Sequence, residues 1–328
     1  MDMSSSFHTA NSCNIAQASD ASTMSLAVQT LADGGLVAIP TETVYGLGAA
    51  INNEVAIAKI FAVKGRPQNH PLIVHLAQLD QLNLVAVNIH PDAITLARAC
   101  WPGPLTILLQ RNENISQSIT GGRDTVAVRI PDNVFTRELI VKLGSPIAAP
   151  SANRFGKVSP TTAQHVCDDL LNDVDLIVDD GACLVGVEST IVDFSVSPPQ
   201  LLRPGGIPVE DIEQILGYTI SDTDGNSRAS GMLQNHYQPS CNVLLVDTDE
   251  EAQKLEGTLA SRYERIRILN RSDNLPLFAT FLYSDLRQAD DDQMQALIVV
   301  LPEWRGLGAA IRDRLTKASG SGPSLSAS

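Results

Sequence analysis

A glycine turn that carries two cations is the first feature of the sequence that could do chemistry. Lys64 and Arg66 flank Gly65 at the end of an apolar stretch, and His70 and His75 follow shortly afterwards. A lysine offers phosphate a point charge and an arginine a planar fork of donors, so this turn could neutralise a phosphate group. The alternative is a helix C-terminus that carries favourably placed cations. The tripeptide alone favours that plainer interpretation.

A second polar segment lies near the middle of the chain. A proline restricts Ala149 to an extended conformation, and Ser151 and Asn153 follow as hydrogen-bonding side chains. Ser159, followed by a proline, then predicts the N-cap of a helix. The N–H groups of a helix start can bind an anion, whereas a polar loop before an ordinary capped helix is the alternative.

Several stretches that read as strands also carry polar residues. In "DTVAVRIP", alternation places Thr125 and Arg129 on one face and the valines on the other. Arg129 is then either solvated, or lines a cleft and pairs with a carboxylate. Ser189 and Arg203 lie in other stretches that read as strands, and the same two alternatives apply to them: exposure to solvent or a place in a cleft. Thr41 belongs to a hydroxyl-rich turn after a strand, "PTETVYGLG", which could equally be a plain strand-to-helix connection.

Several familiar catalytic patterns are missing from the sequence. It contains no G-x-x-x-x-G-K-[ST] loop, no G-x-S-x-G turn and no H-E-x-x-H metal pattern. No cysteine has an adjacent partner that indicates a nucleophile. What remains is a set of cations, hydroxyls and amides at strand ends. This set fits catalysis by positioning and charge neutralisation, as in phosphoryl or nucleotidyl transfer.

The composition limits the possible partners. The 328 residues carry a formal net charge of -14, and 44% of them are hydrophobic. A protein that grips a long nucleic acid usually presents a basic face, and no Lys/Arg-rich run occurs here, so a small anionic ligand is the better expectation. No apolar run approaches the roughly 20 residues of a membrane-spanning helix, and the N-terminus does not resemble a secretory signal.

The cysteines predict a reducing, cytoplasmic setting. They are odd in number and widely spaced, and no C-x-x-C pair occurs, so we expect neither a zinc site nor a disulfide framework. The positions are Cys13, Cys100, Cys167, Cys183 and Cys241.

The elements that must position these residues form an α/β pattern in two parts. Several predicted strands follow one another without a helix, which predicts a mixed sheet with helices packed on it. We expect a disordered tail over 1–24, a catalytic domain over 25–217, a linker over 218–240, a small α/β domain over 241–318 and a disordered tail over 319–328.

Seven short motifs occur in an order that resembles one family. They are "IPTETVYGLG", "KGRPQNHPLIVH", "WPGPLT", "VAVRIPD", "APSAN", "GVESTIVD" and "LLRPGGI". Together they resemble the YrdC-type domain of threonylcarbamoyl-AMP synthases. "HYQP" and the C-terminal α/β region look like the longer, two-domain form of that family, and the resemblance runs from about Ser25 to Ala318.

The resemblance implies both a fold and a reaction. The fold would be a twisted open mixed α/β sheet with a large cleft, joined to a small C-terminal Rossmann-like α/β domain. The enzyme would be a nucleotidyltransferase that makes L-threonylcarbamoyladenylate and pyrophosphate from L-threonine, bicarbonate or CO2, and ATP with Mg²⁺. A tRNA threonylcarbamoyl-transfer machinery would receive the adenylate. No strong direct nucleic-acid binding and no membrane contact are implied.

The resemblance also implies roles for individual residues, with no protein ligand assigned to a metal. Lys64 and Arg66 would be the catalytic residues. Residues for ATP would be Lys64, Arg66, His70, Thr125, Ser151, Asn153, Ser159, Arg203 and Tyr237. Residues for threonine would be Thr41, His75, Arg129, Ala149 and Ser189. The linker departs from the family pattern at Ser230-Gly231-Met232, which lacks the usual proline, so a linker that closes as a lid would be more flexible.

Two other functions stay open at this point. A non-catalytic YrdC-like module could recognise RNA without chemistry. A carbamoyl-transfer enzyme of the hydrogenase-maturation type could use a related domain, but it would need acylphosphatase and zinc-finger segments that this sequence lacks.

Overall fold

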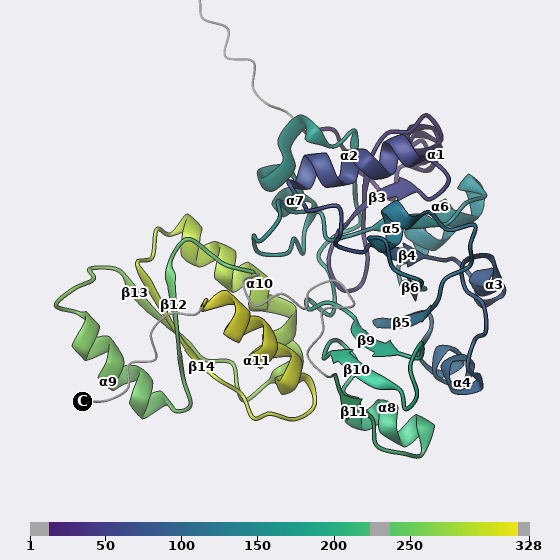
Figure 1. Ribbon diagram of the computed structural model, residues 1–328. Coiled ribbons are helices and arrows are strands. Elements are labelled where there is room, and N and C mark those ends of the chain that lie inside the picture. The colour runs from purple at the N-terminus through teal and green to yellow at the C-terminus, as the bar shows by residue number, and fades with distance from the viewer. Residues whose placement is uncertain (1–12, 224–236, 321–328) are drawn as a thin grey trace, which may run out of the picture.

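The computed structural model describes residues 13–223 and 237–320 of the chain. They form a large domain built on one wide sheet, followed by a small domain built on a second sheet (Figure 1). The unusual linker motif at 230–232 lies outside the described residues. Within the described residues, none of the helices has the length and the apolar composition that crossing a bilayer requires.

The large sheet is mixed, as the run of consecutive predicted strands indicates. Its neighbours are parallel in some pairs, such as β4–β6, and antiparallel in others, such as β5–β6. Among the described residues it has 11 strands, in the order β1 (Ile15–Gln17), β8 (Leu176–Asp179), β2 (Val37–Ile39), β3 (Gly46–Ala50), β7 (Ile147–Ala149), β4 (Ile73–His75), β6 (Thr125–Arg129), β5 (Leu105–Gln110), β9 (Thr190–Asp193), β10 (Gln200–Arg203) and β11 (Ser221–Asp222).

Helices cover both faces of this sheet. Residues of α1 (Thr23–Ala32) and α6 (Val134–Leu143) share one buried cluster with Ile39 and Ile147. The larger cluster, on the opposite face, takes in α2 (Glu54–Lys64), α4 (Pro91–Cys100), α7 (Ala163–Leu170) and α8 (Val209–Leu216). Short helices α3 (Leu82–Val85) and α5 (Gln117–Thr120) and the 3₁₀ turns Leu79–Gln81 and Leu171–Asp173 complete the domain.

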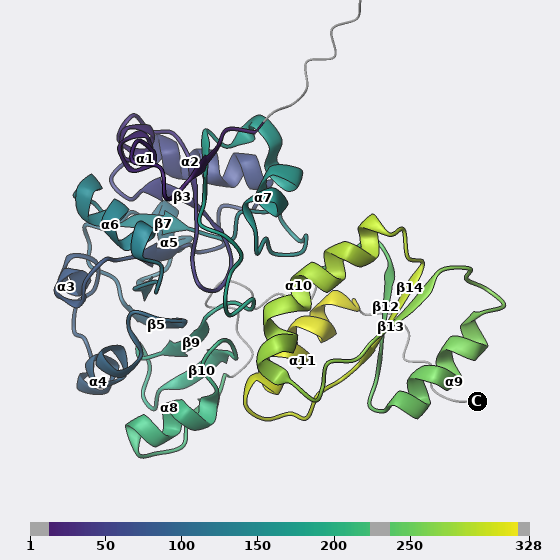
Figure 2. The same ribbon diagram turned by 180° about the vertical axis from the view of Figure 1, so that it is seen from behind.

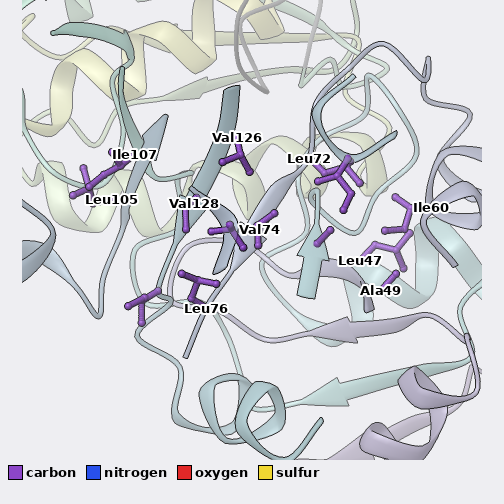
Figure 3. Packing of buried hydrophobic residues seen from close by; sticks show 14 of the residues in the cluster. Leu47, Ala49, Ile60, Leu72, Val74, Leu76, Leu105, Ile107, Val126 and Val128 are labelled. Carbon is purple, nitrogen blue, oxygen red and sulfur yellow. The ribbon is translucent and has the colours of Figure 1, made fainter. Parts of the chain in front are cut away.

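Strand β6 shows how the sheet separates its core from a polar face. Val126 and Val128 point into the larger cluster together with Val74 and Leu47 (Figure 3). The predicted alternation is confirmed, because Arg129 lies off this cluster and is nevertheless only 4% exposed. The register places Arg129 opposite His75 of β4.

The small domain is a three-layer α/β unit. Its parallel sheet has the order β12 (Asn242–Val246), β14 (Ala296–Val300), β13 (Ile266–Leu269). Helix α9 (Asp249–Leu259) covers one face, whereas α10 (Leu275–Asp291) and α11 (Leu307–Ala318) lie between this sheet and the large domain (Figure 1 and Figure 2). Val44, Val158 and Val187 of the large domain join the cluster of α10 and α11, so the two domains share one apolar core.

The predicted N-terminal tail is too long. Residues 15–17 form β1, which pairs with β8, and α1 begins at Thr23, before the start of the catalytic domain expected at residue 25. The expectation of no disulfide is also wrong, because Cys13 and Cys167 are joined although 154 residues separate them. Pairing of β1 with β8 brings the two cysteines together, and such proximity leaves no trace in sequence spacing.

Further local expectations differ from the structure. Thr162, not Ser159, caps α7, and its side chain accepts a hydrogen bond from His165 N. The alternative reading of "PTETVYGLG" as a plain strand-to-helix connection does not hold, because strand β3 follows the turn. The longest helix of the small domain, α10, was not predicted from the sequence at all. The linker prediction is likewise too broad, because Ser221–Asp222 pairs with β10.

Candidate active site

A pocket in the large domain gathers most of the predicted site residues, with Tyr237 reaching it from the end of the linker. Its predicted lining residues are Thr41, Arg66, His75, Arg129, Ala149, Ser151, Ser189, Arg203 and Tyr237. The sequence did not single out the other lining residues, Thr43, Val44, Gly46, Ile73, Pro150 and Glu188.

Arg129 lines the pocket and pairs with a carboxylate. Its Nη2 lies 2.6 Å from Glu42 Oε1, and both side chains are buried. Its Nη1 donates to Thr43 Oγ1 at 2.8 Å and its Nε donates to Gly103 O at 3.2 Å. Three directions of the guanidinium fork are thereby fixed, which makes Arg129 a preorganised receptor for a carboxylate.

The turn Thr41–Val44 supports this pair. Thr41 Oγ1 donates to Val44 O at 2.6 Å and accepts from Thr43 N at 3.2 Å. Glu42 Oε2 accepts a hydrogen bond from Asp132 N at 3.0 Å. The hydroxyl-rich turn noticed in the sequence therefore forms part of the pocket wall through Thr41, Thr43 and Val44. The sequence reasoning also missed Glu42, which holds Arg129.

His75 adds no positive charge to the pocket. Burial, and then the neighbouring charge of Arg129, lowers the pKa of His75 to about 3. Its Nδ1 lies 3.2 Å from Ile73 O. At neutral pH the His75 ring is therefore an uncharged part of the pocket wall.

Arg66 is held at the C-terminal end of α2. Gly65 ends that helix in the left-handed conformation at φ 62°, which a glycine adopts without strain. Arg66 Nη2 donates to Pro71 O at 3.0 Å, and the guanidinium lies 5.8 Å from the centroid of the Phe155 ring. Burial lowers the pKa of Arg66 to about 10, so it remains a cation at neutral pH.

Lys64 lies behind the pocket wall rather than on it. Its Nζ donates to Ser151 O at 2.7 Å and also to Asn153 O, and the residue is 3% exposed. Burial, and then the charge of Arg66, holds the pKa of Lys64 well below its usual range. Ser151 Oγ in turn donates to Asn153 Oδ1 at 2.5 Å. Lys64 therefore ties the Ser151–Asn153 turn to the end of α2.

Ser189 and Arg203 form another part of the wall. Arg203 Nη2 donates to Ser189 O at 2.7 Å and to Ser189 Oγ at 3.2 Å. Ser189 Oγ also lies 2.7 Å from Thr106 Oγ1. Burial lowers the pKa of Arg203, but an arginine starts high enough to stay charged.

The remaining predicted residues lie outside the pocket. Ser159 is fully buried, and its Oγ donates to Glu188 Oε1 at 2.8 Å, so it acts through a lining residue. His70 meets the Phe155 ring edge-on at a centroid distance of 5.3 Å. Thr125 starts β6 and Arg129 ends it, so the two lie about 13 Å apart along the strand.

No protein ligand set for a metal is found in the described parts of the chain, where no group of three or more His, Cys, Asp or Glu side chains is arranged around a common point. Glu188, which lines the pocket, and Glu42, which precedes the lining residue Thr43, each pair with an arginine.

Comparison with known proteins shows to which family this chain belongs. The family described as "Telomere recombination", which groups Sua5, YciO and YrdC, matches residues 29–205, and "Threonylcarbamoyl-AMP synthase, C-terminal domain" matches residues 207–320. The threonylcarbamoyl-AMP synthase of Pyrococcus abyssi is 40% identical over 90% of this chain and 93% of its own length. This chain belongs to the threonylcarbamoyl-AMP synthase family.

Other similarities agree with that membership. The threonylcarbamoyl-AMP synthase of Bacillus subtilis is 38% identical, over 90% of this chain and 92% of its own. A crystal structure of P. abyssi Sua5 complexed with L-threonine is 38% identical and superposes with a TM-score of 0.88, over 94% of this chain and 97% of that one. The resemblance and the two-domain α/β fold expected from the sequence are therefore confirmed.

Proposed function

We propose that this chain forms L-threonylcarbamoyladenylate and pyrophosphate from L-threonine, bicarbonate or CO2, and ATP. The product serves the threonylcarbamoyl modification of the adenosine beside the anticodon in tRNAs that read ANN codons. One observation carries the proposal. In a member of this family, Arg66, Arg129 and Arg203 converge with hydroxyl groups on a single buried pocket.

The Arg129 side of the pocket is the proposed threonine subsite. Arg129 offers a guanidinium to the substrate carboxylate, and the ion pair with Glu42 holds that guanidinium in place. Thr43, His75 and Ala149 surround this pair. The L-threonine complex of the P. abyssi structure supports an amino-acid subsite in this fold.

The Arg66 side, with Arg203 and Ser151, is the proposed site of the ATP phosphates. After the threonine ammonium group loses a proton, the amine nitrogen bonds to the carbon of CO2 and gives up a second proton, which leaves a carbamate. From bicarbonate the same bond forms while a carbon–oxygen bond breaks, and water leaves with that second proton. A carbamate oxygen then bonds to the α-phosphorus, and the bond from that phosphorus to the pyrophosphate oxygen breaks. Mg²⁺ enters with ATP and shares the charge of the phosphates. Lys64 keeps the Ser151 turn in place by holding its carbonyl oxygen.

The proposed partner is the machinery that transfers the threonylcarbamoyl group to tRNA, and the proposed location is the cytoplasm. A disulfide such as Cys13–Cys167 is uncommon in that compartment. The acidic composition, with a net charge of -14, argues that the small adenylate and not the tRNA is held tightly.

Pyrophosphate release tests the proposal. We expect release from ATP that requires both L-threonine and bicarbonate. A parallel titration with tRNA should show weak binding at physiological salt. Tight tRNA binding that falls steeply with salt, without substrate-dependent pyrophosphate release, would instead favour the RNA-binding module.

A further inference from the structure

A side chain from the small domain reaches the wall of the pocket in the large one. Arg314 of α11 is fully buried, and its Nε donates to Glu188 Oε2 at 2.8 Å. Its Nη1 donates to Pro204 O at 2.7 Å and to Asp313 Oδ2 at 2.7 Å. Arg314 therefore crosses the domain boundary and binds two separate segments of the large domain.

Two tyrosines complete this cluster. Tyr283 of α10 donates its hydroxyl to Glu188 Oε2 at 2.7 Å. The Tyr237 ring stacks on the Tyr283 ring with centroids 5.4 Å apart, and the Arg314 guanidinium lies 5.8 Å from the Tyr237 centroid. Tyr237 itself lines the pocket. The cluster thus joins α10, α11, the linker end and the pocket wall.

The charges of this cluster depend on one another. Burial alone would raise the pKa of Glu188, but the charges of Arg314 and Arg203 and the hydrogen bonds from Arg314 and Tyr283 hold that pKa at about 2. Removing one partner of a buried ion pair leaves an uncompensated charge, which is strongly unfavourable. Without Arg314, the carboxylate of Glu188 must therefore move, be hydrated or take up a proton.

The two segments that Arg314 binds are the two that carry the Ser189–Arg203 contact. Glu188 immediately precedes Ser189, and Pro204 immediately follows Arg203. Arg203 connects the same two segments from the pocket side, because it donates to Ser189 O at 2.7 Å. Arg314 thus fixes the relative position of both segments from behind the pocket.

We infer that Arg314 is a positioning residue, through which the small domain sets Ser189 and Arg203 in the geometry that the reaction needs. The inference rests on the proposed function for the identity of the reaction. It assigns the small domain a role inside the active site, carried by Arg314 and Tyr283 acting on Glu188.

The structure offers a matched control. Arg287 of α10 also crosses between the domains, where its Nη2 lies 2.6 Å from Asp169 Oδ2 and donates to Val158 O at 2.5 Å. Neither Asp169 nor Val158 lines the pocket. Arg287→Gln therefore removes a contact between the domains that does not include Glu188 itself. Val158 precedes Ser159, whose hydroxyl donates to Glu188, so any effect on that carboxylate would be indirect.

The test compares Arg314→Gln, Arg314→Lys and Arg287→Gln in the full chain. Displacements of about 1 Å in an active site can lower rates by about 10²-fold, and we expect that scale of loss in kcat/KM for L-threonine with Arg314→Gln. Arg314→Lys should recover part of it, because a lysine keeps the charge opposite Glu188. Arg287→Gln should stay within about threefold of the unsubstituted chain, as expected when no site group is displaced.

Hydrogen exchange of residues 186–206 gives a second readout that needs no activity. We expect faster exchange there in Arg314→Gln than in Arg287→Gln. Equal exchange in the two variants, or equal losses of kcat/KM, would overturn the inference. If the unsubstituted chain makes no adenylate, the proposed function fails, and the exchange data alone decide the role of Arg314.

Tyr283→Phe keeps the inference testable if Arg314→Gln does not fold. This change removes one hydrogen bond to Glu188 and keeps the ring stack on Tyr237. A loss of about tenfold in kcat/KM is expected, at the lower end of what one hydrogen bond to a charged group contributes. Unchanged kinetics together with unchanged exchange over 186–206 would contradict the inference.

Discussion

The arginines on the pocket wall differ in the groups that hold them. Arg129 is paired with the Glu42 carboxylate, whereas Arg203 donates to Ser189 and Arg66 donates to the Pro71 carbonyl. Under the proposed function, Arg129 belongs to the amino-acid side of the pocket, and Arg66 and Arg203 belong to the phosphate side.

Replacing Arg66 tests the phosphate side. Arg66→Ala removes a buried cation where charge develops on the transferred group, so a rate loss on the order of 10²–10³ is expected. Pyrophosphate release under saturating substrates measures it. Arg98→Ala, at an exposed position of α4, is the control and should leave the rate unchanged. A loss under about threefold for Arg66→Ala would contradict its role.

Replacing Arg129 tests the amino-acid side. Arg129→Lys keeps a positive charge but cannot contact Glu42, Thr43 and Gly103 O at the same time. We expect L-threonine binding to weaken by about tenfold or more, because the planar fork is lost. Calorimetric titration with L-threonine measures this, with the melting temperature checked in parallel. Unchanged affinity in the folded variant would rule out this subsite.

The neutral state of His75 predicts a pH dependence of stability. The pKa of His75 is about 3 in the folded chain and about 6.5 in an unfolded one. Below pH ~6.5 the unfolded state therefore binds the proton and the folded state does not, so acidification lowers the free energy of unfolding. In urea titrations between pH 7 and 5, His75→Gln should lose less stability than the unsubstituted chain. Identical slopes would contradict the assignment.

For single residues, the sequence predicted which side chains belong to the site better than it predicted which groups those side chains contact. Arg129, Ser189 and Arg203 stand out because polar groups interrupt apolar strands. The carbonyl oxygens that hold Lys64, and the pairing of Glu188 with Arg314 across 126 residues, depend on how distant segments meet. No local sequence pattern indicates that these distant segments come into contact.

At the scale of elements, β1 is the least expected part of the large domain. It adds to the sheet edge beside β8, and the Cys13–Cys167 disulfide attaches the chain just before it to α7. The polar composition of the first residues suggested disorder. A strand of only three residues, such as β1, gives little signal in the sequence. The pairing becomes favourable only on an edge that β8 has already formed.

The disulfide predicts a measurable contribution to stability. Cys13→Ser opens a covalent loop, so the free energy of unfolding should fall by about 2–4 kcal/mol under oxidising conditions. Urea denaturation measures the loss, and Cys100→Ser, which removes a free cysteine, should show little change. Under reducing conditions Cys13→Ser and the unsubstituted chain should converge. Equal stability under oxidising conditions would show that the bond contributes nothing.

Two errors among the helices have clear physical causes. In α10 the apolar run from Leu275 resembles a strand broken by a proline, but that proline lies in the first turn, where a helix tolerates it, and Asn274 caps the start. Before α7, both Ser159 and Thr162 could serve as caps. Tertiary structure decides for Thr162, because the Ser159 hydroxyl is bound to Glu188.

For the whole molecule, a strongly negative net charge coexists with a pocket lined by three arginines. The net charge is -14, yet Arg66, Arg129 and Arg203 are all buried around one space. The two-domain α/β architecture followed from the order of strand and helix patterns. The sequence patterns did not predict that α10 and α11 place Tyr283 and Arg314 against the pocket. That placement depends on the apolar core that the two domains share.

Mass spectrometry of the reaction products tests the central claim most directly. The full chain is mixed with L-threonine, ATP, Mg²⁺ and isotopically heavy bicarbonate. The account predicts an ion with the mass of L-threonylcarbamoyladenylate, carrying the heavy carbon and absent when threonine is omitted. ATP that stays intact, or is cleaved without any labelled adenylate, would contradict it.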